Sequence, residues 1–184
     1  MTQYYFNPDS CQIPRLKDLD AQWQSIPDSK IKSMIVVENQ YLEFQLFLLA
    51  SLCFIWNNGT STVRGYVDHS LRAGAVKAGI LLYASIVEAA LRAHVEKRGY
   101  PLPANERHRT FGKVLESWEA SGTKELNGAW ADIKQIQEHR NTIHLYKAAA
   151  DPNTDDFRDI LARETNLLEA GSRAMKAVQQ LKSP

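Results

Sequence analysis

Residues 75–95 read AVKAGILLYASIVEAALRAHV, a run that is apolar on almost every side of the helix it predicts. A surface helix keeps one polar face, whereas a helix that is apolar all round is covered by other elements. Only Ser85, Glu88 and Arg92 interrupt this apolar surface, and their spacing places them on one face. The sequence therefore predicts a central helix that several neighbours cover.

The rest of the chain predicts further helices around this one. The expected elements are a short helix over residues 16–23, a long one over 30–56, the central helix over 68–98, a shorter one over 106–120, one over 130–146 and a closing helix from 155 almost to the end. Ile35 and Val36 also suit a strand, so the segment before Glu38 stays ambiguous. The predicted fold class is all-α, an up-and-down bundle of four long helices with a short helix across it.

Length and composition favour one domain. The chain has 184 residues, of which 44% are hydrophobic, enough for one real core and too few for two. Residues 1–15 carry Pro8 and Pro14 without periodicity, and residues 1–28 as a whole are expected to form an N-terminal arm. Residues 29–184 are then the single helical domain.

The balance of charge excludes a general attraction to polyanions. Lys and Arg number 22 against 21 Asp and Glu, a net charge of +1, so any site for nucleic acid has to be local. The two cysteines, Cys11 and Cys53, fit neither a disulfide framework nor a metal spacing. No metal site or cofactor is expected.

The apolar run FQLFLLASLCFIW, residues 44–56, raises the question of a membrane. It has 13 residues, which falls short of the roughly 20 that a spanning helix needs. A buried core helix is therefore the expectation, with no membrane partner. The N-terminus lacks the basic and apolar regions of a secretory signal, so we expect a cytoplasmic protein.

A second informative stretch is residues 130–146, WADIKQIQEHRNTIHLY. At about 100° per residue, Ile133 and Ile136 share one side of the predicted helix, and Arg140 and His144 continue the same line. A cation placed on a buried seam costs several kcal/mol unless it finds a partner. The seam therefore calls for either a function or a buried ion pair.

This stretch resembles the signature of the HEPN superfamily, helical domains named for higher eukaryotes and prokaryotes and nucleotide binding. That family carries an Arg, a polar residue that is often Asn, and then a His, with four to six residues between the Arg and the His. In one toxin branch a Tyr follows two positions after the His. Arg140, Asn141, His144 and Tyr146 match these roles in order, with an Arg-to-His spacing one residue shorter than the family's. The similarity in helix order covers roughly residues 70–182.

The resemblance implies a metal-independent endoribonuclease, a toxin or antiviral defence component that acts as a homodimer. Arg140, Asn141 and His144 would be catalytic, and Glu88 and Tyr146 would support them. A histidine can move the protons of RNA cleavage, and an arginine fork can hold the phosphate. The implied partners are RNA and an antitoxin or a nucleotidyltransferase, which in the toxin branch modifies the tyrosine.

Other interpretations stay open at this point. Arg140 could pair with Glu88 inside the bundle, His144 could be a core histidine, and Tyr146 could be an aromatic that packs at the bundle end. The basic cluster at residues 106–109 could touch phosphate or form a solvated first turn. The alternative function is a non-catalytic helical module that dimerises or docks onto a larger assembly.

Overall fold

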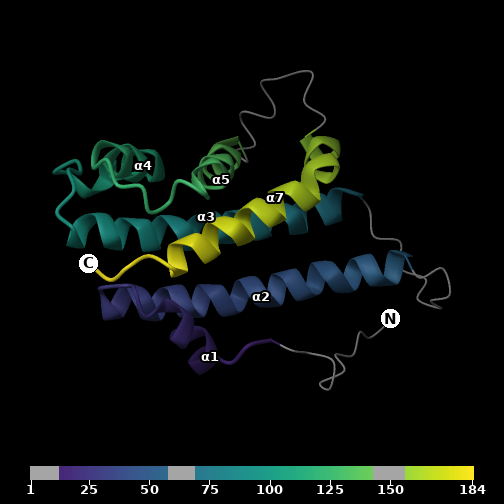
Figure 1. Ribbon diagram of the computed structural model, residues 1–184. Coiled ribbons are helices and arrows are strands. Elements are labelled where there is room, and N and C mark those ends of the chain that lie inside the picture. Colours follow the sequence, from purple (N-terminus) through teal and green to yellow (C-terminus); the bar gives the residue numbers. More distant parts are fainter. Residues whose placement is uncertain (1–12, 58–68, 143–155) are drawn as a thin grey trace.

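A computed structural model describes residues 13–57, 69–142 and 156–184. Throughout these ranges the regular structure is helical and no strand occurs (Figure 1). The predicted all-α class is confirmed. The segment before Glu38, which also suited a strand, belongs to a helix.

The elements follow one another in a simple order. They are α1 (Leu16–Asp20), the 3₁₀ turn η1 (Ala21–Trp23), α2 (Ser29–Asn57), α3 (His69–Lys97), the 3₁₀ turn η2 (Glu106–His108), α4 (Phe111–Ala120), α5 (Trp130–Thr142) and α7 (Asp156–Gln179). Helices α2 and α3 have 29 residues each and α7 has 24, whereas the described part of α5 has 13. Three of the four helices expected to be long are thus long within the described ranges.

One predicted element is wrong. A single helix was expected over residues 106–120, but the chain makes the η2 turn first, and α4 begins only at Phe111. The Asn105 side chain accepts a hydrogen bond from the backbone N–H of Arg107, 3.0 Å away, and this contact favours a separate short turn. The break brings Arg107 and Arg109 to the start of α4.

Helix α3 is the centre of the fold, as its sequence predicted. It packs against α7, α2, α5 and α4, and Figure 1 shows α2 on one side of it and α4 and α5 on the other. By length and composition alone, residues 70–97 would suffice to cross a membrane. Half of their most apolar window is buried within the bundle, as in the core helix of a globular protein.

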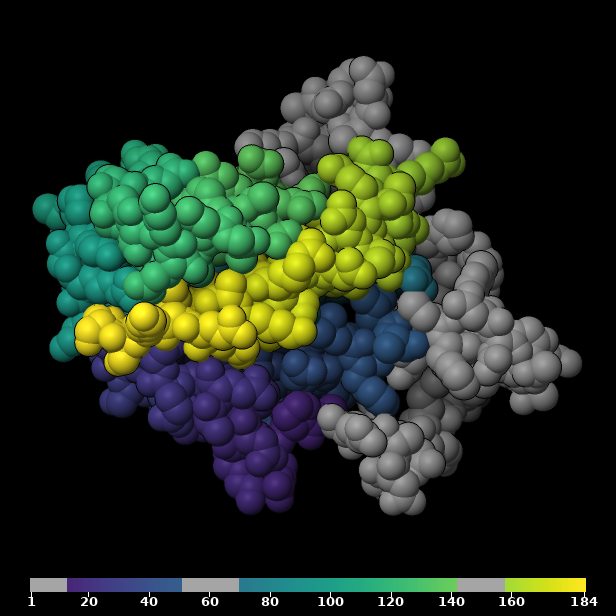
Figure 2. Space-filling model, viewed as in Figure 1, coloured from purple at the N-terminus to yellow at the C-terminus, as the bar shows by residue number. Residues whose placement is uncertain are grey.

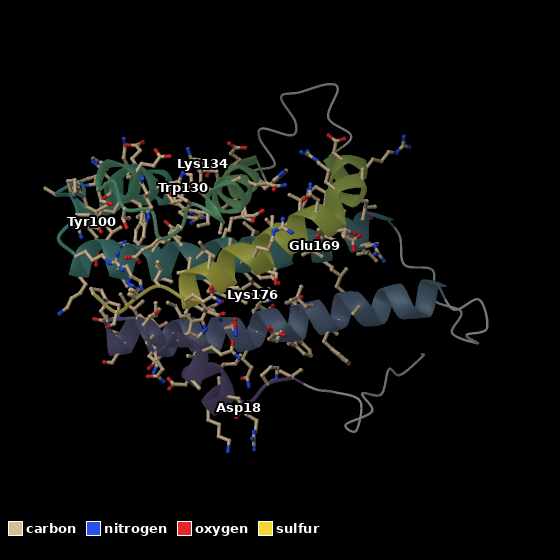
Figure 3. All side chains as sticks on the ribbon, in the orientation of Figure 1. Asp18, Tyr100, Trp130, Lys134, Glu169 and Lys176 are labelled. Atoms are coloured by element: carbon tan, nitrogen blue, oxygen red, sulfur yellow. The ribbon has the colours of Figure 1, made fainter. Side chains whose placement is uncertain are left out.

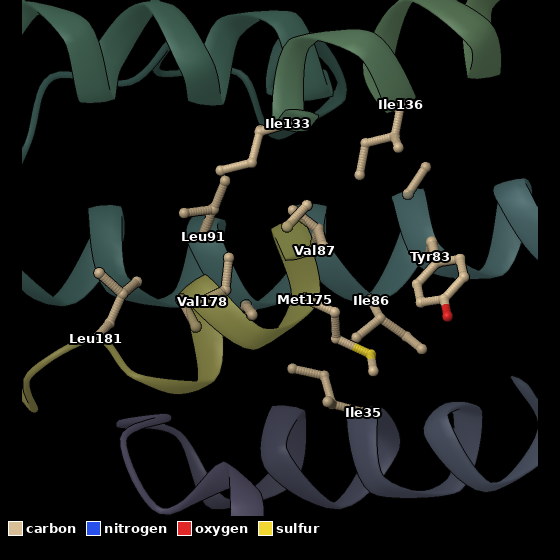
Figure 4. Close-up of a cluster of buried hydrophobic side chains, with 14 of the residues drawn as sticks. Ile35, Tyr83, Ile86, Val87, Leu91, Ile133, Ile136, Met175, Val178 and Leu181 are labelled. Carbon is tan, nitrogen blue, oxygen red and sulfur yellow. The ribbon is translucent and has the colours of Figure 1, made fainter. Parts of the chain in front are cut away.

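The hydrophobic core is formed where three helices approach α3. Ile133 and Ile136 of α5 reach down to α3, and Ile35 of α2 reaches up towards Ile86 and Met175 (Figure 4). Fully burying a side chain of this size contributes about 1.5–3 kcal/mol. In α2, by contrast, Leu49 is buried but residues 44–48 are only half-buried, so the apolar run is less enclosed than expected.

Helices α3 and α7 approach each other closely at Gly171. A Cβ atom added to Gly171 would lie 2.5 Å from Cδ2 of Tyr83, so no larger residue fits there without a shift. Tyr83 therefore faces α7. Residues 81, 85, 88 and 92 lie at least about 140° around the helix from Tyr83 and so form the face of α3 turned away from α7.

Helix α5 is tied to α4 on its outer side. Trp130 is half-buried and donates a hydrogen bond from Nε1 to Glu119, 2.9 Å away, and the Nζ of Lys134 lies 2.6 Å from the same carboxylate. Figure 3 shows Trp130 and Lys134 together at this edge of the molecule. Figure 2 shows α7 lying across the molecule between the α4–α5 layer and α2.

Candidate functional site

The part of the predicted seam that the structure describes, from Ile133 to Arg140, is present on α5. Ile133 and Ile136 are fully buried against α3, and Arg140 follows one turn later with 35% of its side chain exposed. Asn141 is exposed. The apolar turns of α5 therefore anchor the helix, while its next turn carries a cation and an amide to the surface.

Arg140 forms an ion pair with Glu88 of α3. Its Nη1 lies 2.6 Å from Oε2 of Glu88, whose side chain is 18% exposed. The Cζ of Arg140 also lies 5.9 Å from the ring centroid of Phe111, a cation–π contact from α4. Three helices thus fix the position of this guanidinium.

This ion pair is not sealed inside the bundle. Arg140 and Glu88 both line an open pocket of about 710 Å³, between α3, α4, α5 and the chain before α4. Its other lining residues are Leu81, Arg107, Arg109, Thr110, Phe111, Gly112, Gln137 and Asn141. Arg140 therefore combines the two arrangements considered from the sequence, because its guanidinium pairs with Glu88 and also lines an open pocket.

Three arginines give this pocket a local positive charge. Arg109 is engaged by Glu96, with 2.9 Å between Nη1 and Oε1, and by the carbonyl oxygen of Pro103. Arg107 is exposed and makes no ion pair with any residue in the ranges that the structure describes. A guanidinium offers several N–H donors in one plane and suits a phosphate or carboxylate. The arrangement can therefore hold an anion although the chain as a whole is nearly neutral.

The carboxylate of Glu88 is held in an unfavourable environment. Burial raises the pKa of Glu88, and the nearby charges of Arg140 and Arg92 oppose that rise. An ionised carboxylate that loses its partner in such a place costs more than an exposed one. Glu88 thus depends on Arg140 for its charge, and Arg140 depends on Glu88 for its position.

The first turn of α4 adds donors to the pocket wall. Thr110 precedes the helix, but its side chain makes no capping hydrogen bond. The first backbone N–H groups of a helix have no partner within the helix, and those of Phe111 and Gly112 belong to this wall. These groups complement the arginines.

The sequence did not single out all of these residues. Gln137, Phe111 and Gly112 were not predicted to belong to a site, and the cluster containing Arg107 and Arg109 was left between two interpretations. The signal for the arginines was their closeness to a helix start. Nothing in the sequence showed that this start lies beside Arg140.

The remaining candidates on this helix are placed only in part. His144 and Tyr146 lie outside the residues that the structure describes. His139, which precedes Arg140 on α5, is half-buried, and this burial, together with the charge of Arg163, lowers its pKa. In the described parts of the chain, no group of three His, Cys, Asp or Glu side chains is arranged to hold a metal ion.

Comparisons with family models, with curated proteins and with solved structures give no match for this chain.

Proposed function

We propose that this chain is a HEPN-like bundle that cuts RNA without a metal ion, with the scissile phosphate bound in the pocket beside Arg140. The observation that supports the proposal is the position of Arg140 on the wall of an open pocket that two further arginines also line. Because the net charge is only +1, the arginines of this pocket supply the local attraction that a polyanion requires.

The proposed chemistry needs one side chain that binds the phosphate and one side chain that acts as a general acid or base. Arg140 binds a phosphate oxygen through N–H groups that the ion pair at Nη1 leaves available. His144, one helical turn further along the sequence, takes the proton of the 2′-hydroxyl group or protonates the leaving 5′-oxygen. The 2′-oxygen forms a new bond to phosphorus as the bond to the 5′-oxygen breaks, which gives a cyclic phosphate and a free 5′-hydroxyl group.

The other residues of the pocket have supporting roles. Glu88 is a positioning residue, because its carboxylate holds the guanidinium of Arg140 at a distance of 2.6 Å. Asn141 contacts the phosphate or the imidazole of His144. Arg107 carries the flanking phosphate, since its guanidinium is not engaged by a described carboxylate. Two copies of the chain act together, and an antitoxin or a nucleotidyltransferase that modifies Tyr146 restrains them.

The test is RNA cleavage by the purified chain in the presence of a chelator. We expect Arg140→Ala and His144→Ala each to slow cleavage by about 10²–10³-fold, the loss typical of one removed charge-stabilising or proton-transferring group. The matched control is Arg173→Ala, because Arg173 pairs with Asp132 on α5 but does not line the pocket. Circular dichroism confirms that each variant is folded. Intact RNA with the chelated wild type, or equal cleavage by His144→Ala, contradicts the proposal.

A second function is supported by a different observation. Met34, Val37 and Tyr41 are 62%, 56% and 50% exposed on one side of α2, and large exposed apolar side chains mark surfaces for protein partners. This favours a helical interaction module without catalysis. A chain that leaves RNA intact but purifies in a fixed ratio with another protein would support this function instead.

A further inference from the structure

A second pocket lies on the face of α3 turned away from α7. It is a groove of about 380 Å³ between α2 and α3. Apolar side chains form much of its lining, with Ile35 and Ile86 buried at its base and Met34 and Ala89 at its sides. Its volume falls within the range of sites for small ligands or for single side chains of a partner.

The apolar surface continues beyond the groove. Met34, Val37 and Tyr41 recur at i, i+3 and i+7 along α2 and therefore form one exposed stripe. Only Met34 of these three lines the groove itself. An apolar surface that extends past the pocket along a helix suits a peptide segment better than a small molecule, because only a chain contacts groove and stripe together.

The charges in the groove specify the occupant further. Arg92 is engaged by Glu96 and Glu106, with distances of 2.9 and 2.8 Å. Glu38 is exposed and makes no ion pair with any residue that the structure describes. Glu88 forms part of the wall, and its carboxylate is already paired with Arg140, so Glu38 is the groove's carboxylate without a described ion pair. The charge left to be neutralised is negative.

We infer that this groove binds a peptide segment of a partner protein in which a Lys or Arg lies between apolar side chains. The apolar side chains pack on Ile35, Ile86 and the stripe of α2, and the basic side chain pairs with Glu38. This inference does not rest on the proposed nuclease function. It assigns a binding surface separate from the arginine-lined pocket.

Glu88 connects the two surfaces because it lines both pockets. The basic side chain that pairs with Glu38 also brings a positive charge into the groove that Glu88 lines, and this charge competes with Arg140 for the carboxylate of Glu88. Binding in the groove therefore loosens the ion pair, and by reciprocity a change at Arg140 alters binding in the groove. This link is observable at Arg140 itself and needs no RNA.

The test uses the full chain and a display library of short random peptides. We expect the selected peptides to carry a Lys or Arg flanked by apolar residues. The peptide that binds most strongly should bind about tenfold more weakly to each of two variants at exposed positions. Glu38→Lys reverses the charge in the groove, and Ser85→Trp fills the groove with a large side chain. The matched control is Glu116→Lys, an exposed glutamate of α4 that lines neither pocket and should leave binding unchanged.

Several outcomes overturn the inference. They are a selection that enriches no sequence, enriched peptides that are acidic, and peptides that bind Glu38→Lys as well as the wild type. Sedimentation of the chain alone adds another, since self-association that Ser85→Trp abolishes would make a second copy the occupant.

The link to the other pocket has its own measurement. The Arg140 side-chain Nε–H resonance, assigned by its loss in Arg140→Lys, should shift when the selected peptide binds. A bound peptide that leaves this resonance unchanged refutes the link between the pockets. Neither measurement involves RNA, so both outcomes are independent of the nuclease proposal.

Discussion

The two faces of α3 differ although the helix is apolar all round. On the face towards α7, Tyr83 packs so closely that only Gly171 fits opposite it. On the face turned away from α7, Ser85 is exposed and Glu88 lines two pockets. The same helix thus packs closely against α7 on one face and presents exposed and charged residues on the other, which places a site on a rigid support.

The largest expected effect comes from the packed face. Gly171→Ala introduces a methyl group 2.5 Å from the ring of Tyr83, and overpacking of this kind costs about 1–3 kcal/mol. The free energy of unfolding from urea titration should fall by this cost less the roughly 1 kcal/mol by which alanine is favoured over glycine inside a helix such as α7. The matched control is Gly74→Ala on the same α3 helix, where an added Cβ meets nothing within 4 Å, and an alanine in a helix is about 1 kcal/mol more favourable than glycine. If both variants lose stability equally, the two faces do not differ as described.

An effect that appears only as the pH is lowered also comes from the packed face. His94 is completely buried, neither ring nitrogen has a partner among the described residues, and burial lowers its pKa to about 4 from 6.5. The charge of Arg98 adds to this shift and that of Glu125 opposes it. The unfolded chain therefore binds a proton between pH 6.5 and 4 that the folded chain does not, so stability falls as the pH decreases through this window.

The check is urea unfolding at several pH values for the wild type and for His94→Phe. The variant should show a weaker decrease in stability between pH 6.5 and 4, whatever its stability at pH 7. Parallel curves for the two proteins would show that His94 titrates as an exposed histidine does.

The smallest effect concerns the open face. A double-mutant cycle with Glu88→Gln and Arg140→Gln should give a coupling of about 1 kcal/mol, because the pair is only partly shielded from water. The exposed pair of Lys113 and Glu116 is the control, and its coupling should lie near about 0.3 kcal/mol. Equal couplings in the two cycles would mean that Glu88 is as well solvated as a surface glutamate.

The fold could be predicted from the sequence wherever the pattern of residues within one helix determines how deeply that helix is buried and where it ends. The run at residues 75–95 predicted the central helix, and Gly99 and Gly122, with φ of 68° and 70°, end helices where they were expected to. The break before Phe111 was missed, because a side chain of Asn105 decides it and helical periodicity does not register such a contact.

The site was accessible only in part for a related reason. The seam on α5 pointed to Arg140, and the pairing with Glu88 was foreseen as one alternative. The pocket itself joins α3, α4, α5 and the turn before α4, and its walls come together only through packing between helices. Periodicity within one helix says nothing about which residues of another helix lie opposite.

The contact between Gly171 and Tyr83 also fixes the axial position of α7. One turn away on either side α7 carries Leu167 and Met175, whose Cβ atoms cannot take the place of the glycine opposite the ring. A shift of α7 along α3 by one helical turn, about 5.4 Å, is therefore blocked in both directions. Helix α7 is therefore held in a single register along α3 at the centre of the bundle.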